Sequence, residues 1–173
     1  LATDGDVRNK TQLMSDLLLT ILPPWGQPTV PIGLGYLSQF LMEHGVSHSV
    51  DDLNVELYNR VDEEHHSLWL PERGSEWADP EKYAAIQEAL EMDIRWAVDR
   101  LDRSPAEVIG FSINQSNNRL SVEVAKRLRK RDPGRILIFG GQSISLIGER
   151  SEIPDRLIDL FVIGEGEVAL IDI

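Results

Sequence analysis

Short apolar runs alternate along the chain with longer segments in which apolar residues recur at helical spacing. The first run covers residues 17–22 and is closed by Pro23 and Pro24. Because it lacks polar alternation, it is typical of a parallel strand that is buried on both faces. Four further runs predict strands at 47–53, 107–112, 136–139 and 160–163. The run at 47–53 is more polar, as expected of a strand near a sheet edge.

The segments between these runs have the apolar spacing of helices. One stripe predicts a helix over about residues 33–44, and Gly45 follows as a C-terminal stop. A second stripe, after the third strand, predicts a helix that ends at about residue 131, and a short helix is expected after the fourth strand. Strand and helix therefore alternate along most of the chain.

Residues 55–104 interrupt this alternation after the second strand. The segment contains two helical stretches, and the second has the clearest signals, because Asp79 can cap it and Pro80 suits its first turn. One apolar stripe continues through it at Tyr83, Ile86, Leu90, Ile94, Ala97 and Leu101. The pattern predicts a helical insertion that ends in one long helix.

The alternation predicts an α/β fold with right-handed crossovers. Five strands in about 150 residues suit a flavodoxin-like (Rossmann-like) three-layer sandwich, whose parallel sheet has the order 2-1-3-4-5. Residues 1–16 are polar and patternless and are expected to form a flexible tail, which leaves residues 17–173 as the domain. Ligands of such sheets bind beyond the carboxyl ends of the strands, which lie here at 23–32, 112–118, 140–143 and 164–167.

Composition and charge narrow the function classes. The 173 residues include 17 Lys and Arg against 29 Asp and Glu, and the net charge of -12 makes nucleic acid an improbable partner. The absence of cysteine excludes disulfides, thiolate metal sites and an iron–sulfur cluster held by this chain alone. No apolar run reaches the ~20 residues of a membrane span, and a cytoplasmic location is expected. The first residue is Leu1 and the last residues continue an apolar pattern, so we expect a piece of a larger protein.

Three familiar uses of this fold conflict with the strand-end loops. A phosphoacceptor receiver domain needs acidic residues after the first strand, Asp after the third and Lys after the fifth, where this chain has proline, Ser112 and Gly164. The prolines of the first loop also remove amide donors that a flavin phosphate would need. Residues 164–169 match a dinucleotide fingerprint, but Glu165 and Glu167 would repel a pyrophosphate.

The histidines do not predict a metal site. His65 and His66 are adjacent on a presumed helix and point about 100° apart. His44 and His48 flank a turn without a third ligand, and no Ser, His and Asp set indicates a hydrolase.

Small and uncharged polar residues at the strand ends remain as candidates for binding. Glycines would let a bulky ligand approach the backbone, Ser and Asn offer hydroxyl and amide partners, and tryptophan offers a flat apolar wall. These features suit a large, planar, amide-bearing ligand. The alternative is that the glycines are turn residues and the asparagines cap a helix. The candidates are Pro24, Trp25, Gly26, Pro31, Gly33, Ser112, Asn114, Ser116, Asn117, Gly140, Gly141, Gln142, Gly164, Glu165 and Gly166.

An ordered set of motifs resembles the N-terminal cobalamin-binding domain of B12-dependent radical S-adenosylmethionine (radical SAM) proteins. The motifs are LTILPPWG at 19–26, PIGLGYL at 31–37, DLN at 52–54, IGFS at 109–112, FGG at 139–141 and GEGE at 164–167. The resemblance implies a five-stranded domain that holds cobalamin over its strand ends. It also implies a separate radical SAM barrel, with a three-cysteine motif for a 4Fe-4S cluster and a site for S-adenosylmethionine, which this cysteine-free chain lacks.

The resemblance further implies that the parent is an enzyme of the methyltransferase or oxidative cyclase type, in which this domain's partner is its own radical SAM domain. Cobalamin domains of the methionine synthase type place a cobalt-ligating His after the first strand, but residues 23–33 contain none. Cobalamin would then bind without a His ligand, and its tail would insert toward Ser112, Gly140 and Gly141. The alternative is a noncatalytic substrate-recognition or interaction domain that has lost cobalamin and uses the acidic insertion to cover the site or meet a partner.

Overall fold

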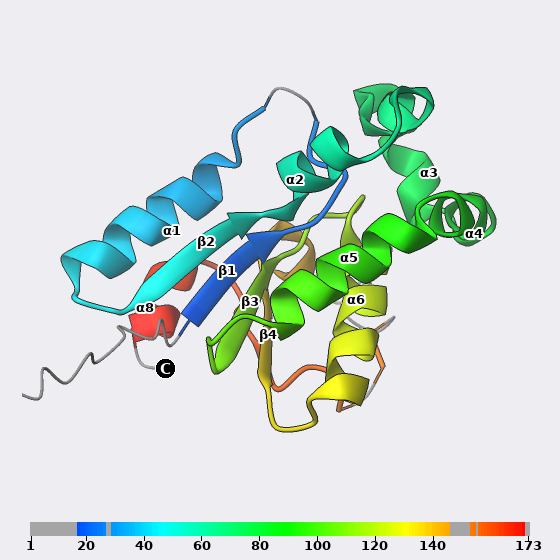
Figure 1. The fold of residues 1–173 in the computed structure, drawn as a ribbon. Coiled ribbons are helices and arrows are strands. Elements are labelled where there is room, and N and C mark those ends of the chain that lie inside the picture. Colours follow the sequence, from blue (N-terminus) through cyan, green and yellow to red (C-terminus); the bar gives the residue numbers. More distant parts are fainter. Residues whose placement is uncertain (1–16, 27–28, 146–152, 155, 172–173) are drawn as a thin grey trace, which may run out of the picture.

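The structure, a computed structural model, describes residues 17–26, 29–145, 153–154 and 156–171 (Figure 1). The tail expected at residues 1–16 lies outside the described residues. Five parallel strands form one sheet in the order β2-β1-β3-β4-β5. The strands are β1 (Leu17–Ile21), β2 (His48–Asp52), β3 (Val108–Ser112), β4 (Ile136–Gly140) and β5 (Leu160–Phe161). The predicted flavodoxin-like α/β fold and strand order are therefore confirmed.

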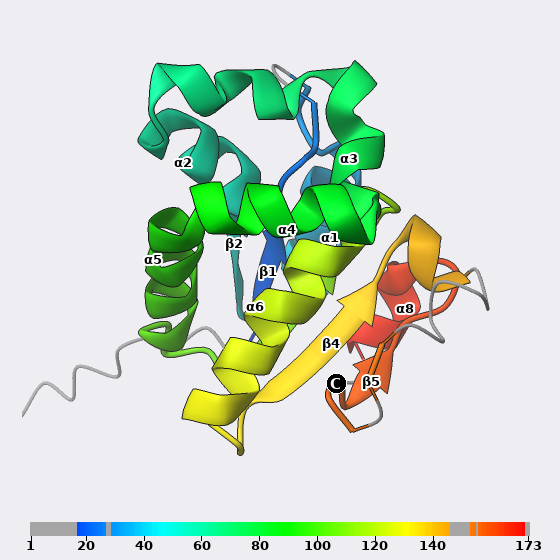
Figure 2. The ribbon, with the colours of Figure 1, turned by 90° about the vertical axis from the view of Figure 1, so that its right-hand side faces the viewer.

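Helices cover both faces of the sheet. Helices α1 (Ile32–Glu43) and α8 (Gly166–Ile171) pack on one face, and α2 (Leu53–Arg60), α5 (Glu91–Asp102) and α6 (Asn118–Arg131) pack on the other (Figures 1 and 2). The alternation of side chains along β1 divides the core, because Leu17 and Leu19 point toward α1 while Leu18 points toward the α5 and α6 side.

The segment after α2 forms a small helical group beside the carboxyl ends of the strands (Figure 2). It comprises the 3-10 helices η1 (Glu63–Trp69) and η2 (Pro71–Arg73), then α3 (Gly74–Ala78) and α4 (Pro80–Ala89). Trp69 and Trp77 are fully buried in it, and their ring N–H groups donate to Asn54 Oδ1 and to the Leu68 carbonyl, both at 2.9 Å. The group therefore has its own buried aromatic centre, which is continuous with the core of the domain.

The predicted long helix over 79–101 is wrong in one respect. Asp79 does cap it and accepts from the Glu81 and Lys82 amides, but the helix breaks at Leu90 into α4 and α5. All six stripe residues are buried, so the apolar spacing continues through a change of direction that the spacing alone does not reveal. Helix α5 belongs to the layer that covers the sheet, where Arg100 holds Asp51 of β2 by two bonds of 2.7 and 3.0 Å.

Within the part of the chain that the structure describes, no helix combines the length and apolar character that crossing a membrane requires.

Candidate functional site

A cavity of about 220 Å³ opens between helices α1 and α8 and the carboxyl ends of β3, β4 and β5. Its walls are mainly apolar side chains and glycines. They consist of Leu19, Gly33, Leu34, Tyr36, Leu37, Gly110, Phe111, Ser112, Ile138, Gly140, Gly141, Val162, Gly164, Glu165, Gly166, Glu167 and Leu170. This is the edge of the sheet at which a parallel α/β fold binds its ligands.

Several of the residues that line this cavity are glycines, and the absence of their side chains leaves the space open. A Cβ at Gly110 of β3 would lie 3.0 Å from Leu19 Cδ2, and one at Gly140 of β4 would lie 3.4 Å from Val162 Cβ. At Gly33 of α1 the Cβ position has no atom of the described residues within 4 Å, so this glycine borders open space. Larger residues at these positions would occupy the cavity or displace its walls.

Gly141 has a different role, because the backbone itself requires it. Its φ of 107° lies in a region that side chains other than glycine rarely adopt. A Cβ there would lie 2.6 Å from the Ile113 carbonyl oxygen. Gly141 therefore fixes the close contact between the β3 and β4 loops and borders the cavity as a consequence.

Seven of the fifteen predicted site residues line the cavity, namely Gly33, Ser112, Gly140, Gly141, Gly164, Glu165 and Gly166. The other eight do not line it, namely Pro24, Trp25, Gly26, Pro31, Asn114, Ser116, Asn117 and Gln142. The expectation of an uncharged polar surface also needs revision, since Glu165 and Glu167 contribute to mainly apolar walls.

The asparagines after β3 hold their own loop. Asn114 Oδ1 accepts from the amides of Ser116 and Asn117, at 2.8 and 2.9 Å. Asn117 is fully buried, and its Oδ1 accepts from the Asn114 amide at 2.8 Å. Its Nδ2 donates to the carbonyls of Leu22 and Ser112, at 3.2 and 3.0 Å. These side-chain groups bond to backbone partners and so hold the loop rather than face a ligand. The alternative that the asparagines cap the helix is wrong in its detail, because Asn117 is the N-cap residue of α6 but makes no side-chain cap bond.

The helical insertion covers the β1 side of the same edge. The buried Asn54 accepts at Oδ1 from the Trp25 amide and from Trp69 Nε1, both at 2.9 Å. A Cβ at Gly74 of α3 would lie 3.1 Å from Ser116 Oγ in the loop after β3. The insertion also meets the loop after β3, so the open part of the edge is the part beside β4 and β5 together with the α1 side of β3.

Sequence reasoning identified Gly33 of α1 and Gly166 of α8 but missed the other residues of these helices that line the cavity. Tyr36 and Leu37 lie three and four residues after Gly33, so all three share one face of α1. That spacing, together with a glycine in the first turn, is the signal that could have identified this wall. Glu167 could have been added from its place in the GEGE motif.

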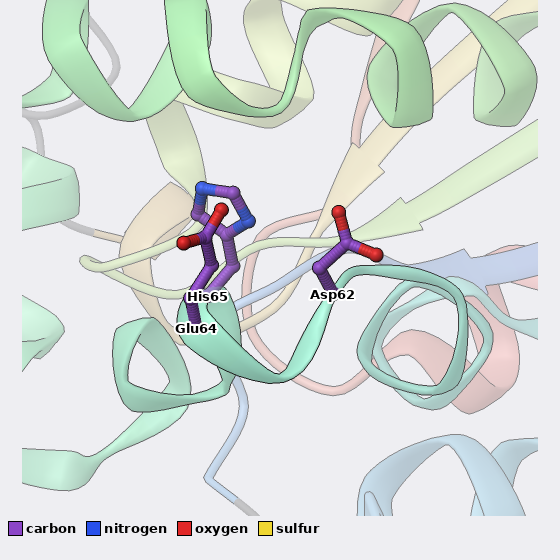
Figure 3. A group of neighbouring side chains, drawn as sticks. All are labelled: Asp62, Glu64 and His65. Carbon is purple, nitrogen blue, oxygen red and sulfur yellow. The ribbon is translucent and has the colours of Figure 1, made fainter.

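A separate group of possible metal ligands lies in the insertion, at Asp62, Glu64 and His65 (Figure 3). One ligand atom from each lies within 4.8 Å of the others. The turn brings them together, because the His65 amide donates to the Asp62 carbonyl at 2.9 Å. The prediction compared only histidines with each other and so overlooked the two carboxylates. Both carboxylates are exposed, and an exposed acidic group of this kind carries no function by itself.

The remaining histidines have partners within the fold. His48 Nε2 is 2.9 Å from Ser38 Oγ, and His44 Nδ1 is 2.8 Å from the Phe40 carbonyl. His66 stacks on Tyr58 with ring centroids 4.2 Å apart. No histidine, lysine or arginine lines the cavity among the residues that the structure describes.

Comparisons of the chain with protein-family models, with curated proteins and with solved structures give no match. The cavity and the motifs that line it are therefore the features that indicate a function.

Proposed function

We propose that this chain is a cobalamin-binding domain that serves a B12-dependent radical SAM enzyme of the methyltransferase or oxidative cyclase type. The observation that carries the proposal is the glycine-walled cavity at the ends of β3, β4 and β5. The motif residues Ser112, Gly140, Gly141, Gly164 and Gly166, which carry the resemblance, all line it. A cytoplasmic location and a radical SAM domain as partner belong to the same proposal.

The size of the cavity supports one ring system as its occupant. Pockets for drug-sized ligands measure about 300–1,000 Å³, and this one measures about 220 Å³. The benzimidazole base of the cobalamin tail is flat and apolar and fits between such walls. The corrin ring is much larger and would lie outside the cavity, over the open part of the edge.

Residues of this chain would hold and orient the cofactor. The apolar walls from Leu37, Phe111 and Val162 would exclude water from the tail, and Gly140 would allow it to approach the β4 backbone. Because the described cavity residues include no histidine, cobalt would receive no His ligand from these walls. Bound cobalamin would supply its cobalt-centred chemistry to the separate radical SAM domain.

A second candidate function is recognition of a substrate or partner without a cofactor. The observation that favours it is the insertion, which covers the β1 side of the edge through Asn54 and Trp69 and meets the loop after β3 at Gly74. Two exposed apolar residues of α1, Ile32 and Tyr36, suit such a contact, and Tyr36 also lines the cavity. Cobalamin binding distinguishes the two functions.

The decisive experiment fills the cavity from α1. We expect Gly33→Leu to weaken hydroxocobalamin binding at least about tenfold, because the new side chain enters the space that the tail needs. Gly35→Leu is the matched control, since its Cβ position on the same helix is equally open and Gly35 does not line the cavity. Binding is measured from the cobalamin absorbance that co-elutes with the protein in gel filtration.

Two outcomes would contradict the proposal. A wild-type chain that retains no absorbance while it remains folded favours the second function. Equal retention by the Gly33→Leu and Gly35→Leu variants would mean that the tail does not use this cavity.

A further inference from the structure

Glu167 has an unusual position in the cavity wall. The residue lies in α8 and lines the cavity, yet its Oε2 is buried and has no hydrogen-bond partner among the residues that the structure describes. Buried polar atoms are nearly always paired, so an unpaired carboxylate oxygen needs an explanation. Glu165 lines the same cavity but is exposed to water, which hydrates its carboxylate.

No group of the described residues donates a hydrogen bond to this oxygen. The titratable groups that line the cavity with it are Tyr36 of α1 and Glu165 of the loop before α8. The walls otherwise consist of apolar side chains, glycines and Ser112. A carboxylate oxygen beside such walls loses its hydration without gaining a bond, and this raises the free energy of the empty state.

A ligand that offers a donor would remove this cost. Its flat apolar part would pack between the glycine walls, and its donor would meet the Glu167 carboxylate. The base of the cobalamin tail is joined to its sugar through one ring nitrogen, and the other nitrogen carries only a lone pair. A lone pair and a carboxylate repel each other unless a proton lies between them.

We propose that Glu167 holds the free ring nitrogen of a benzimidazole-type base through one shared proton. This inference rests on the proposed function, of which it specifies the tail site. Binding then takes one proton from the buffer and forms one N–H···O or O–H···N bond between the ring nitrogen and the carboxylate. No other covalent bond forms or breaks.

Proton uptake is the property that the experiment measures. Wild-type protein is titrated by calorimetry with N-methylbenzimidazole, and separately with hydroxocobalamin, at about pH 7.5 in two buffers that differ in ionisation enthalpy. The difference between the two apparent enthalpies gives the number of protons taken up. We expect about one proton for the base, with an affinity that falls about tenfold for each unit of rising pH.

Two variants show whether the proton that is taken up on binding is held by Glu167. Glu167→Gln presents an amide N–H₂ that donates to the ring nitrogen without a proton from solvent, so the base still binds and the uptake falls to near zero. Glu43→Gln is the control, since it removes an exposed carboxylate of α1 that does not line the cavity, and the uptake stays at about one.

The outcomes separate this inference from the proposed function. Unchanged proton uptake in Glu167→Gln, or no binding of the base to wild type, overturns the inference. Cobalamin binding without proton uptake overturns it while the proposed function stands. Binding of the base with uptake that depends on Glu167, but without cobalamin binding, supports the inference and defeats the proposed function.

Discussion

Gly141 and Gly33 border the same cavity, yet they differ in what the backbone allows. Gly141 adopts a φ of 107° and its Cβ would lie 2.9 Å from the Ile113 amide nitrogen. Gly33 is in the first turn of α1 with open space at its Cβ position. A substitution at Gly141 is therefore expected to change the stability of the fold, whereas one at Gly33 is expected to change the space in the cavity.

We expect Gly141→Ala to lower the free energy of unfolding by about 2 kcal/mol or more, because it combines backbone strain with a clash against backbone atoms. Gly33→Ala should leave the stability unchanged or raise it by up to about 1 kcal/mol, since alanine favours the helix. Urea unfolding followed by circular dichroism measures both. Equal midpoints for the two variants would mean that the Gly141 loop relaxes freely.

At the scale of elements, two helices begin at a capping aspartate, and the fold shifts the pKa values of these two aspartates in opposite directions. Asp52 caps α2 and accepts from the Val55 amide at 3.1 Å. Burial is the largest cause that raises its pKa above the ordinary value. Asp79 caps α4, and the bond from the Lys82 amide lowers its pKa. Ionisation of the capping aspartate therefore lowers the stability of the fold at Asp52 and raises it at Asp79.

The pH dependence of two Asn variants tests this contrast. With its folded pKa raised, Asp52 binds a proton more tightly in the folded than in the unfolded state, so its ionisation lowers stability as pH rises through that window. Asp52→Asn keeps the cap and should melt at a higher temperature than wild type at pH 7, with a difference that shrinks as pH falls toward 4. Asp79→Asn should melt at a lower temperature at pH 7, because it removes a carboxylate that the fold stabilises. A melting temperature for Asp52→Asn at or below that of wild type at pH 7 contradicts the argument.

The elements could be predicted from the sequence far better than the site. Strands β1, β3 and β4 are apolar because helices cover both faces, and a run of that kind has few alternative structures. The break at Leu90 was not predictable from spacing, since Leu90 is as buried as its neighbours in the stripe. Asn117 was assigned to the ligand because an amide can bond a ligand or a backbone group equally well, and only the fold shows that Leu22 and Ser112 use it.

At the scale of the molecule, the carboxyl edge of the sheet is divided into a covered and an open part. The insertion covers the β1 part, where Asn54 links the first loop to Trp69. The open part ends at β5, a two-residue edge strand whose Leu160 and Phe161 are 45% and 38% exposed. Stability should follow the same division, since strands with two neighbours and two covered faces open least.

Hydrogen exchange can test this division and connect it with function. We expect the slowest amides in β1 and β3, and exchange about a hundredfold faster or more in β5, whose only described neighbour is β4. If the tail of cobalamin enters between α1, α8 and the ends of β4 and β5, its binding must slow exchange at Val162 and in α8 more than in β2, which lies at the opposite edge of the sheet. Protection that instead increases in α3 and α4 would locate the ligand at the insertion, and the open part of the edge would then have no part in binding.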